Sequence, residues 1–121
     1  MPQTSPIIVP DLSGLSHGVP VSVLVDEWFD CEADLTRACD LQDELQRSRQ
    51  RGRVFERLER DIDAQQDALI ARQARLQRSI SATPCVSPTD AAGKAKLIAT
   101  GDMDPDVVCR LAEDIAGWLT R

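Results

Sequence analysis

The residues that could do chemistry include four cysteines and a single histidine, His17. None of the four cysteines belongs to a C-x-x-C pair: Cys31, Cys39, Cys85 and Cys109. Zinc sites usually have paired ligands at short spacing, so this pattern favours reduced cysteines that pack as small apolar side chains. A metal site or a redox couple is the alternative interpretation.

The patterns that typify catalytic sites are incomplete. A nucleophile needs a positioned base, and His17 lies in a segment rich in Pro and Gly. Gly93-Lys94 lacks the upstream glycine and the following Ser or Thr of a phosphate-binding loop. Paired carboxylates such as Asp26 and Asp30 lie on charged helix faces, where carboxylates are usually solvated. The sequence therefore predicts no catalytic, cofactor-binding or metal-binding residue, no cofactor and no small-molecule substrate.

The most distinctive chemical feature is a run of six arginines within residues 47–60: Arg47, Arg49, Arg51, Arg53, Arg57 and Arg60. Two glutamates leave this run with a charge of +4, in a chain whose net charge is −6. Guanidinium groups bind phosphates and carboxylates through paired hydrogen bonds. The run is either a patch for an anionic partner or a solvated end that opposes aggregation. Phe55 is the only aromatic residue within the run, so sequence-specific reading of nucleic acid is not expected.

Composition limits the fold classes and the cell compartments that fit this chain. A chain of 121 residues fits one domain, and an aromatic content of 3% is poor material for a β-sandwich or a base-stacking platform. No apolar run approaches the roughly 20 residues that span a bilayer. Residues 1–10 lack the basic and apolar regions of a secretory signal, so we expect a cytoplasmic protein with no membrane partner.

The elements that position these residues follow from apolar spacing. Residues 1–20 contain four prolines and two glycines, which predicts an irregular arm. Apolar residues then recur every three or four positions from Val21 to Leu45, and again from Phe55 to Ile80, which indicates two helices. The two faces are out of phase across Gly52, the one plausible helix terminator between them.

Folding the chain at Gly52 places Trp28 opposite Leu76 and Leu35 opposite Leu69, which predicts an antiparallel hairpin of helices over about 21–48 and 53–82. The acidic start of the first helix would then lie beside Arg72, Arg75 and Arg78, as charges flank the seam of a coiled coil. A continuous helix that dimerises is the alternative, because one glycine costs only about 1 kcal/mol within a helix.

Two shorter helices are predicted over about 88–100 and 105–120. Ser87-Pro88 and Asp104-Pro105 are helix start signals, with Asp90 completing a capping box, and Gly101 ends the first of the two helices. Both tryptophans are expected in the core, or one of them as an exposed interface anchor. Lys94 and Lys96 are expected at a solvated helix edge.

The segment from Ile80 to Leu97, with Thr83-Pro84, Ser87 and Gly93-Lys94, follows the pattern I-x-x-T-P-x-x-S-x-x-x-x-x-G-x-x-K. It resembles a segment of short, uncharacterised bacterial all-helical proteins that also have a Trp-containing helix and an acidic amphipathic C-terminal helix. The resemblance would cover residues 21–121, although Ser87 stands where threonine is expected. It implies a helical fold and transfers no site, because no activity is known for those proteins.

The sequence thus predicts an irregular arm over 1–20 and one helical-bundle domain over 21–121. We expect a non-catalytic protein–protein interaction or scaffold module, with self-association included among its contacts. The alternative is a nucleic-acid-associated accessory protein that uses the arginine-rich hairpin tip, and an enzyme is a third and more distant interpretation.

Overall fold

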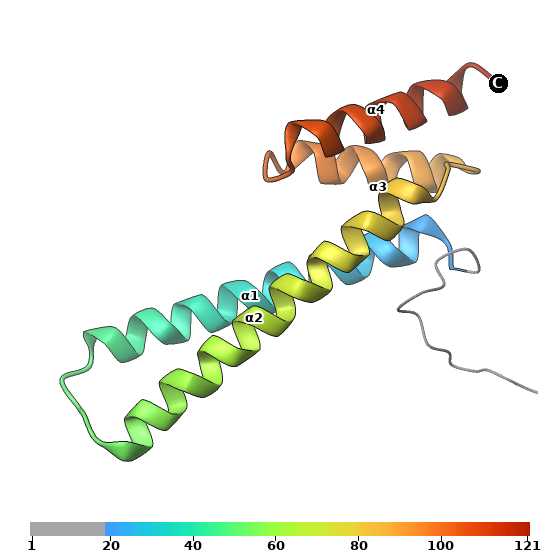
Figure 1. Ribbon diagram of the computed structural model, residues 1–121. Coiled ribbons are helices and arrows are strands. Elements are labelled where there is room, and N and C mark those ends of the chain that lie inside the picture. Colours follow the sequence, from blue (N-terminus) through green and yellow to red (C-terminus); the bar gives the residue numbers. More distant parts are fainter. Residues whose placement is uncertain (1–18) are drawn as a thin grey trace, which may run out of the picture. The chain divides into compact units, whose positions relative to one another are not determined.

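The computed structural model describes residues 19–121, and four α-helices make up most of them (Figure 1): α1 (Val21–Arg47), α2 (Arg53–Ala82), α3 (Pro88–Ala99) and α4 (Pro105–Leu119). Within residues 19–121 there is no strand. The predicted all-α fold is confirmed, and every helix ends within one residue of its expected position. None of these helices has the length and apolar character needed to cross a membrane. The predicted arm, apart from Val19 and Pro20, lies outside the described residues.

The turn between α1 and α2 forms where the sequence predicts it. Gly52 has a φ of 131°, a conformation that side chains with a Cβ rarely adopt, and its carbonyl accepts a hydrogen bond from Glu56 N at 2.9 Å as α2 begins. The Arg51 guanidinium donates to the carbonyl oxygens of Ser48 at 3.1 Å and Gln50 at 2.6 Å. Arg51 therefore satisfies two backbone acceptors of the turn that follows α1.

The short helices begin at their predicted caps. The Ser87 hydroxyl accepts a hydrogen bond from Asp90 N at 3.2 Å, and the Asp90 carboxylate accepts one from Val86 N at 3.0 Å. The capping box is thus present, but the Asp90 carboxylate bonds the backbone N–H of Val86, one residue before the N-cap Ser87, and not that of Ser87 itself. Asp104 lies at the N-cap of α4 without a side-chain capping bond, and Gly101, with a φ of 75°, follows α3 as predicted.

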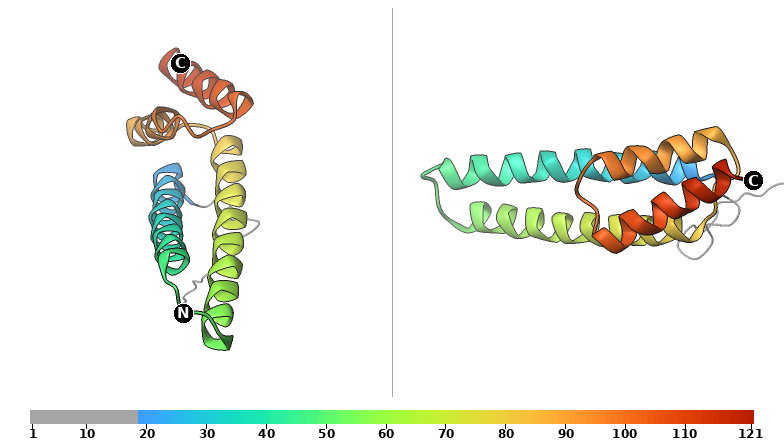
Figure 2. Two further views of the ribbon diagram at one scale, coloured as in Figure 1. Left: turned by 90° about the vertical axis from the view of Figure 1, so that its left-hand side faces the viewer. Right: turned by 90° about the horizontal axis from the view of Figure 1, so that it is seen from above.

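The chain divides into two compact units. The hairpin unit is Asp26–Gln77, and the terminal unit consists of the described residues before Asp26 together with Arg78–Arg121. In the hairpin unit α1 and α2 run side by side in opposite directions, and in the terminal unit α3 and α4 lie side by side (Figure 2). The single domain expected over 21–121 stays a prediction.

In the hairpin unit the apolar faces of α1 and α2 pack against each other along a line that we call the seam, as the helical period predicts. Trp28 is 4% exposed and Cys31, Ala38, Ile62 and Leu76 are also buried. Toward Gly52 the seam opens, because Leu45 and Phe55 are half-buried and Leu58 is exposed. The continuous-helix alternative is excluded because residues 48–52 between α1 and α2 are not helical.

Glutamines fix the register of the seam. Gln66 donates to Gln42 at 3.2 Å, and Gln42 donates in turn to the Asp63 carboxylate at 3.0 Å. Gln73 donates to the Glu32 carboxylate at 3.1 Å. Because a one-residue slip would break these bonds, polar positions within an apolar seam select one alignment of the helices.

The terminal unit has its own core. Its fully buried apolar side chains come from the start of α1, the end of α2, the α2–α3 connection, α3 and α4: Val21, Val25, Ile80, Cys85, Leu97 and Leu111. A Cβ on Gly93 would meet Val25 Cγ2 at 3.2 Å, so this glycine permits close packing. Trp118 is half-buried, which leaves Trp28 as the tryptophan that fulfils the prediction of a core position.

Candidate functional site

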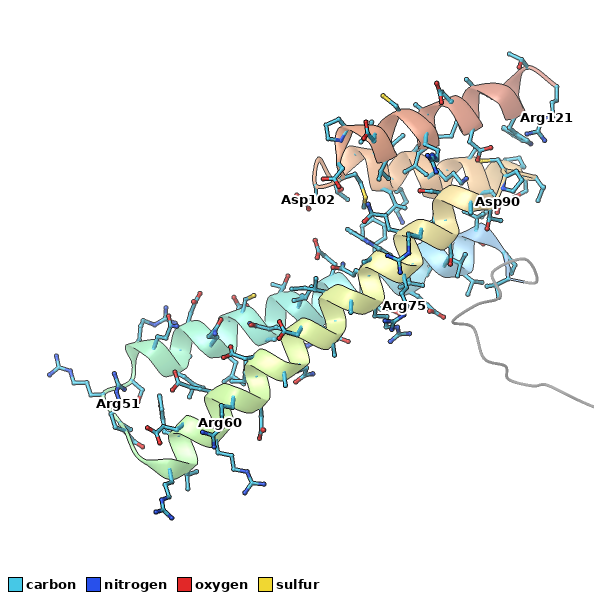
Figure 3. The ribbon with its side chains drawn as sticks, in the orientation of Figure 1. Arg51, Arg60, Arg75, Asp90, Asp102 and Arg121 are labelled. Carbon is cyan, nitrogen blue, oxygen red and sulfur yellow. The ribbon has the colours of Figure 1, made fainter. Side chains whose placement is uncertain are left out.

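The six arginines predicted as a patch gather at the turn end of the hairpin unit, and we call this group the arginine tip. Arg47 ends α1, Arg49 and Arg51 lie in the turn, and Arg53, Arg57 and Arg60 lie in the first turns of α2. All six are exposed, and Figure 3 labels Arg51 and Arg60 at this end. The structure therefore brings the predicted residues together in space as well as in sequence.

Two arginines of the tip already have partners. Arg47 lies 3.1 Å from the Glu44 carboxylate, and the Arg51 guanidinium, besides its bonds to the turn, stacks 5.5 Å from the centre of the Phe55 ring. The side chains of Arg49, Arg53, Arg57 and Arg60 form no hydrogen bond or ion pair among the described residues. Their donors are available to an anionic partner.

The free arginines on α2 surround a shallow hollow. It has a volume of about 450 Å³ and is lined by Arg53, Val54, Glu56, Arg57 and Arg60. Val54 is 83% exposed between these charges. A surface of this kind presents guanidinium groups together with one apolar contact, a combination common where proteins meet proteins.

The outer faces of the two hairpin helices carry opposite charge. On α1 a stripe of exposed residues opposite the seam forms what we call the acidic edge: Asp26, Asp30, Ala33, Arg37, Asp40 and Glu44. On α2 the corresponding stripe forms the basic edge: Arg57, Arg60, Ala64, Asp67, Ala71 and Arg75. Each set falls within about 80° of arc at 3.6 residues per turn. The sequence prediction missed both edges, although the same helical period that marks the seam also marks them.

Few groups on the edges are neutralised within the chain. Arg37 bonds Asp34 on its own helix, and Glu44 bonds Arg47. Among the described residues, the one ion pair that joins the two hairpin helices is Arg72 to Glu27 at 3.3 Å, beside the seam as predicted. Arg75 and Arg78, also expected beside the acidic start of the first helix, are exposed and form no ion pair among the described residues. The hairpin therefore presents its charge outward.

The terminal unit contains a buried ionic cluster that overturns one prediction. Lys94 is 0% exposed, and its Nζ donates to the Thr83 carbonyl at 2.6 Å and to the Asp114 carboxylate. The prediction of a solvated Lys94 is wrong, because this side chain turns inward to tie α4 and the end of α2 to α3. Lys96, two positions along α3, is exposed as expected.

Asp114 joins the same cluster to the α2–α3 connection. Its carboxylate also accepts a hydrogen bond from Cys85 N at 3.1 Å. Burial alone would raise the pKa of Asp114, but hydrogen bonds from Lys94 and Cys85, together with the Lys94 charge, outweigh it and lower that pKa. Burial, with the hydrogen bond to Asp114, raises the pKa of the Cys85 thiol to about 11. Such a thiol stays protonated, and the cluster acts as a structural clamp.

The cysteines are free thiols, two of them buried (Cys31 and Cys85) and two exposed (Cys39 and Cys109). Burial raises the pKa of Cys31 as well. Within residues 19–121 no three His, Cys, Asp or Glu side chains come together in a way that could hold a metal ion. A cleft of about 610 Å³ in the terminal unit is lined by residues that include Val21, Pro84, Val86 and Asp90, and the Asp90 carboxylate there already caps α3.

No protein-family model, no curated protein and no solved structure matches this chain.

Proposed function

We propose that this chain is a non-catalytic, cytoplasmic protein–protein interaction module, and that the hairpin unit makes the contact. The observation that carries this proposal is the outward charge of the hairpin, with an acidic edge on α1 and a basic edge on α2, both exposed. Charge patterns of this kind govern encounter and alignment between proteins more than they stabilise a single chain.

Site-specific photocrosslinking tests the proposal. A photoreactive amino acid is placed at Ala33 on the acidic edge or at Ala64 on the basic edge, and at Ala99, exposed on α3, as the matched control. We expect protein adducts from the two hairpin positions, more than from the control, and their yield should survive digestion with nuclease. Adducts that disappear with nuclease, or that form equally at Ala99, would contradict the proposal.

A second candidate is an accessory role on nucleic acid, and the free guanidinium groups of the arginine tip favour it. The double variant Arg49→Glu with Arg53→Glu changes the charge of the tip by −4, which reduces its +4 to zero. If the tip binds phosphate groups, wild-type protein should be retained on duplex DNA at low salt, and retention should fade by about 200 mM salt. The double variant should not be retained.

A matched control separates this role from general electrostatics. Arg75→Glu with Arg110→Glu makes the same change in net charge at two exposed positions outside the tip. Equal loss of retention in both double variants would show that the tip has no particular part in binding. Failure of the wild-type protein to bind at low salt would remove this second candidate.

A further inference from the structure

The two charged edges of the hairpin carry complementary patterns of charge. The only base on the acidic edge is Arg37, and the only acid on the basic edge is Asp67. Both lie at the same level of the hairpin, because Gln66 donates to Cys39 at 3.6 Å just beyond them along the seam. An acidic stripe interrupted by one base therefore matches a basic stripe interrupted by one acid.

The match extends along both helices. With Arg37 set against Asp67 and the hairpin turns at the same end, Asp30 faces Arg75 and Glu44 faces Arg60. With the turns at opposite ends, Asp30 faces Arg60 and Glu44 faces Arg75. Ala33 faces an alanine in either arrangement, Ala71 or Ala64, so the helices can approach closely there. In both directions Asp30, Arg37 and Glu44 each face a residue of opposite charge.

These edges cannot pair within one chain. At 3.6 residues per turn each edge lies about 150° or more from the seam of its own helix, so the two edges point away from each other. We propose that the partner of the hairpin is a second copy of this chain, with the acidic edge of one copy docked on the basic edge of the next. This inference rests on the proposed function and names the partner.

Such a contact is heterologous, because it joins two different surfaces. Each copy keeps one free acidic edge or one free basic edge after docking, so a third copy can add to either end. The contact is also mainly electrostatic, since the side chains of Asp26, Asp30 and Asp40 on one edge, and of Arg57, Arg60 and Arg75 on the other, form no bond within the described part of the chain. Association should therefore weaken as salt screens these charges.

The test reverses the central pair. Arg37→Asp sets an acid against Asp67 of the next copy, and Asp67→Arg sets a base against Arg37. Each variant should self-associate about tenfold more weakly than the wild type, since an attraction becomes a repulsion. An equal mixture of the two should associate as tightly as the wild type, because the carboxylate introduced in the first variant meets the guanidinium introduced in the second.

The measurement is sedimentation velocity of nuclease-treated protein at about 50 mM and about 500 mM salt, which brackets weak and strong screening. Wild type should exceed the 13.3 kDa of one chain at low salt and return to it at high salt. Asp43→Arg is the control, with the same charge change as Asp67→Arg at an exposed α1 position outside both edges. It should associate like the wild type, and circular dichroism should show that every variant keeps its helices.

Four results would overturn the inference. They are a wild-type protein that stays at the mass of one chain at low salt, single variants that associate like the wild type, a mixture that does not recover association, and association that requires nucleic acid. Photocrosslinks from the hairpin to a different protein, with no self-association, would leave the proposed function in place while removing the second copy as partner.

Discussion

Replacing Lys94 with methionine is expected to destabilise the terminal unit severely. Methionine keeps most of the length and the apolar stem of lysine, so the change removes mainly the ammonium group. Asp114 then loses its cationic partner, and the Thr83 carbonyl loses its donor. Removing one partner of a buried ion pair costs about 3–5 kcal/mol.

The structure places the expected value toward the lower end of that range. The Lys94 side chain is 0% exposed, but that of Asp114 is 19% exposed, so water stabilises part of the orphaned carboxylate. We therefore expect a loss of about 3 kcal/mol in the free energy of unfolding, a large fraction of the roughly 5–15 kcal/mol that holds a domain of ordinary stability.

Urea denaturation followed by circular dichroism measures this loss, and hydrogen exchange locates it. Amides of α3 and α4 should exchange faster in the variant, with a smaller effect on α2 near Gly52. The matched control is Lys96→Met on the same helix, where the side chain is exposed and its loss should change stability by no more than about 1 kcal/mol.

The double variant Lys94→Met with Asp114→Leu decides whether charge pairing is the cause. Because it removes both charges, it should be more stable than Lys94→Met alone, although Cys85 N loses its acceptor. Losses that simply add, or a Lys94→Met variant as stable as the control, would refute the reasoning that Lys94 and Asp114 act as a buried pair.

Three further outcomes are expected. Because the pKa of Asp114 is lowered in the folded protein, its contribution to stability is complete above the unfolded pKa of about 3.9 and is lost as the pH falls through the folded pKa. The urea concentration at the midpoint of unfolding should therefore fall in acid. That fall should be smaller for the variant Asp114→Asn, which has no carboxylate to protonate. Gly52→Ala should lower the free energy of unfolding by about 1–3 kcal/mol, because the φ of Gly52 is 131°. Gly117→Ala should raise the free energy of unfolding by about 0.5–1 kcal/mol, because Gly117 lies within α4 and a Cβ there meets open space. Equal effects of the two substitutions on thermal unfolding would contradict this prediction. In native protein a thiol reagent should modify Cys39 and Cys109 rapidly, whereas Cys31 and Cys85 should react only after denaturation; four rapid reactions in native protein would contradict the burial of Cys31 and Cys85.

The hairpin could be predicted from sequence because its information is local and periodic. The spacing of Trp28, Cys31 and Leu76 marks one face of each helix, and the phase change at Gly52 marks the turn. The caps of α3 could be predicted for the same reason, since Ser87 and Asp90 lie within one turn of each other. Periodicity and capping involve neighbours in the chain and need no knowledge of the tertiary fold.

Lys94 could not be placed in this way. Its partners are a carbonyl at the end of α2 and a carboxylate on α4, and neither is a neighbour in the sequence. Lys94 and Lys96 have similar local surroundings in a helix rich in small residues, yet one is buried and the other exposed. The arginine tip was predictable as a cluster, whereas the complementary edges require the helical period to be applied to charged as well as apolar positions.

The division of the chain into units has a consequence for the order of folding. The hairpin unit is continuous in sequence, so its helices need only the short turn at Gly52 to meet, and such local contacts form fast. The terminal unit is discontinuous: Val25 packs at Gly93, and the two are far apart along the chain. During synthesis the first segment leaves the ribosome well before its partners exist, and domains complete themselves only when their last segments are made. The apolar residues at the start of α1 therefore stay exposed to solvent until α3 and α4 have been synthesised.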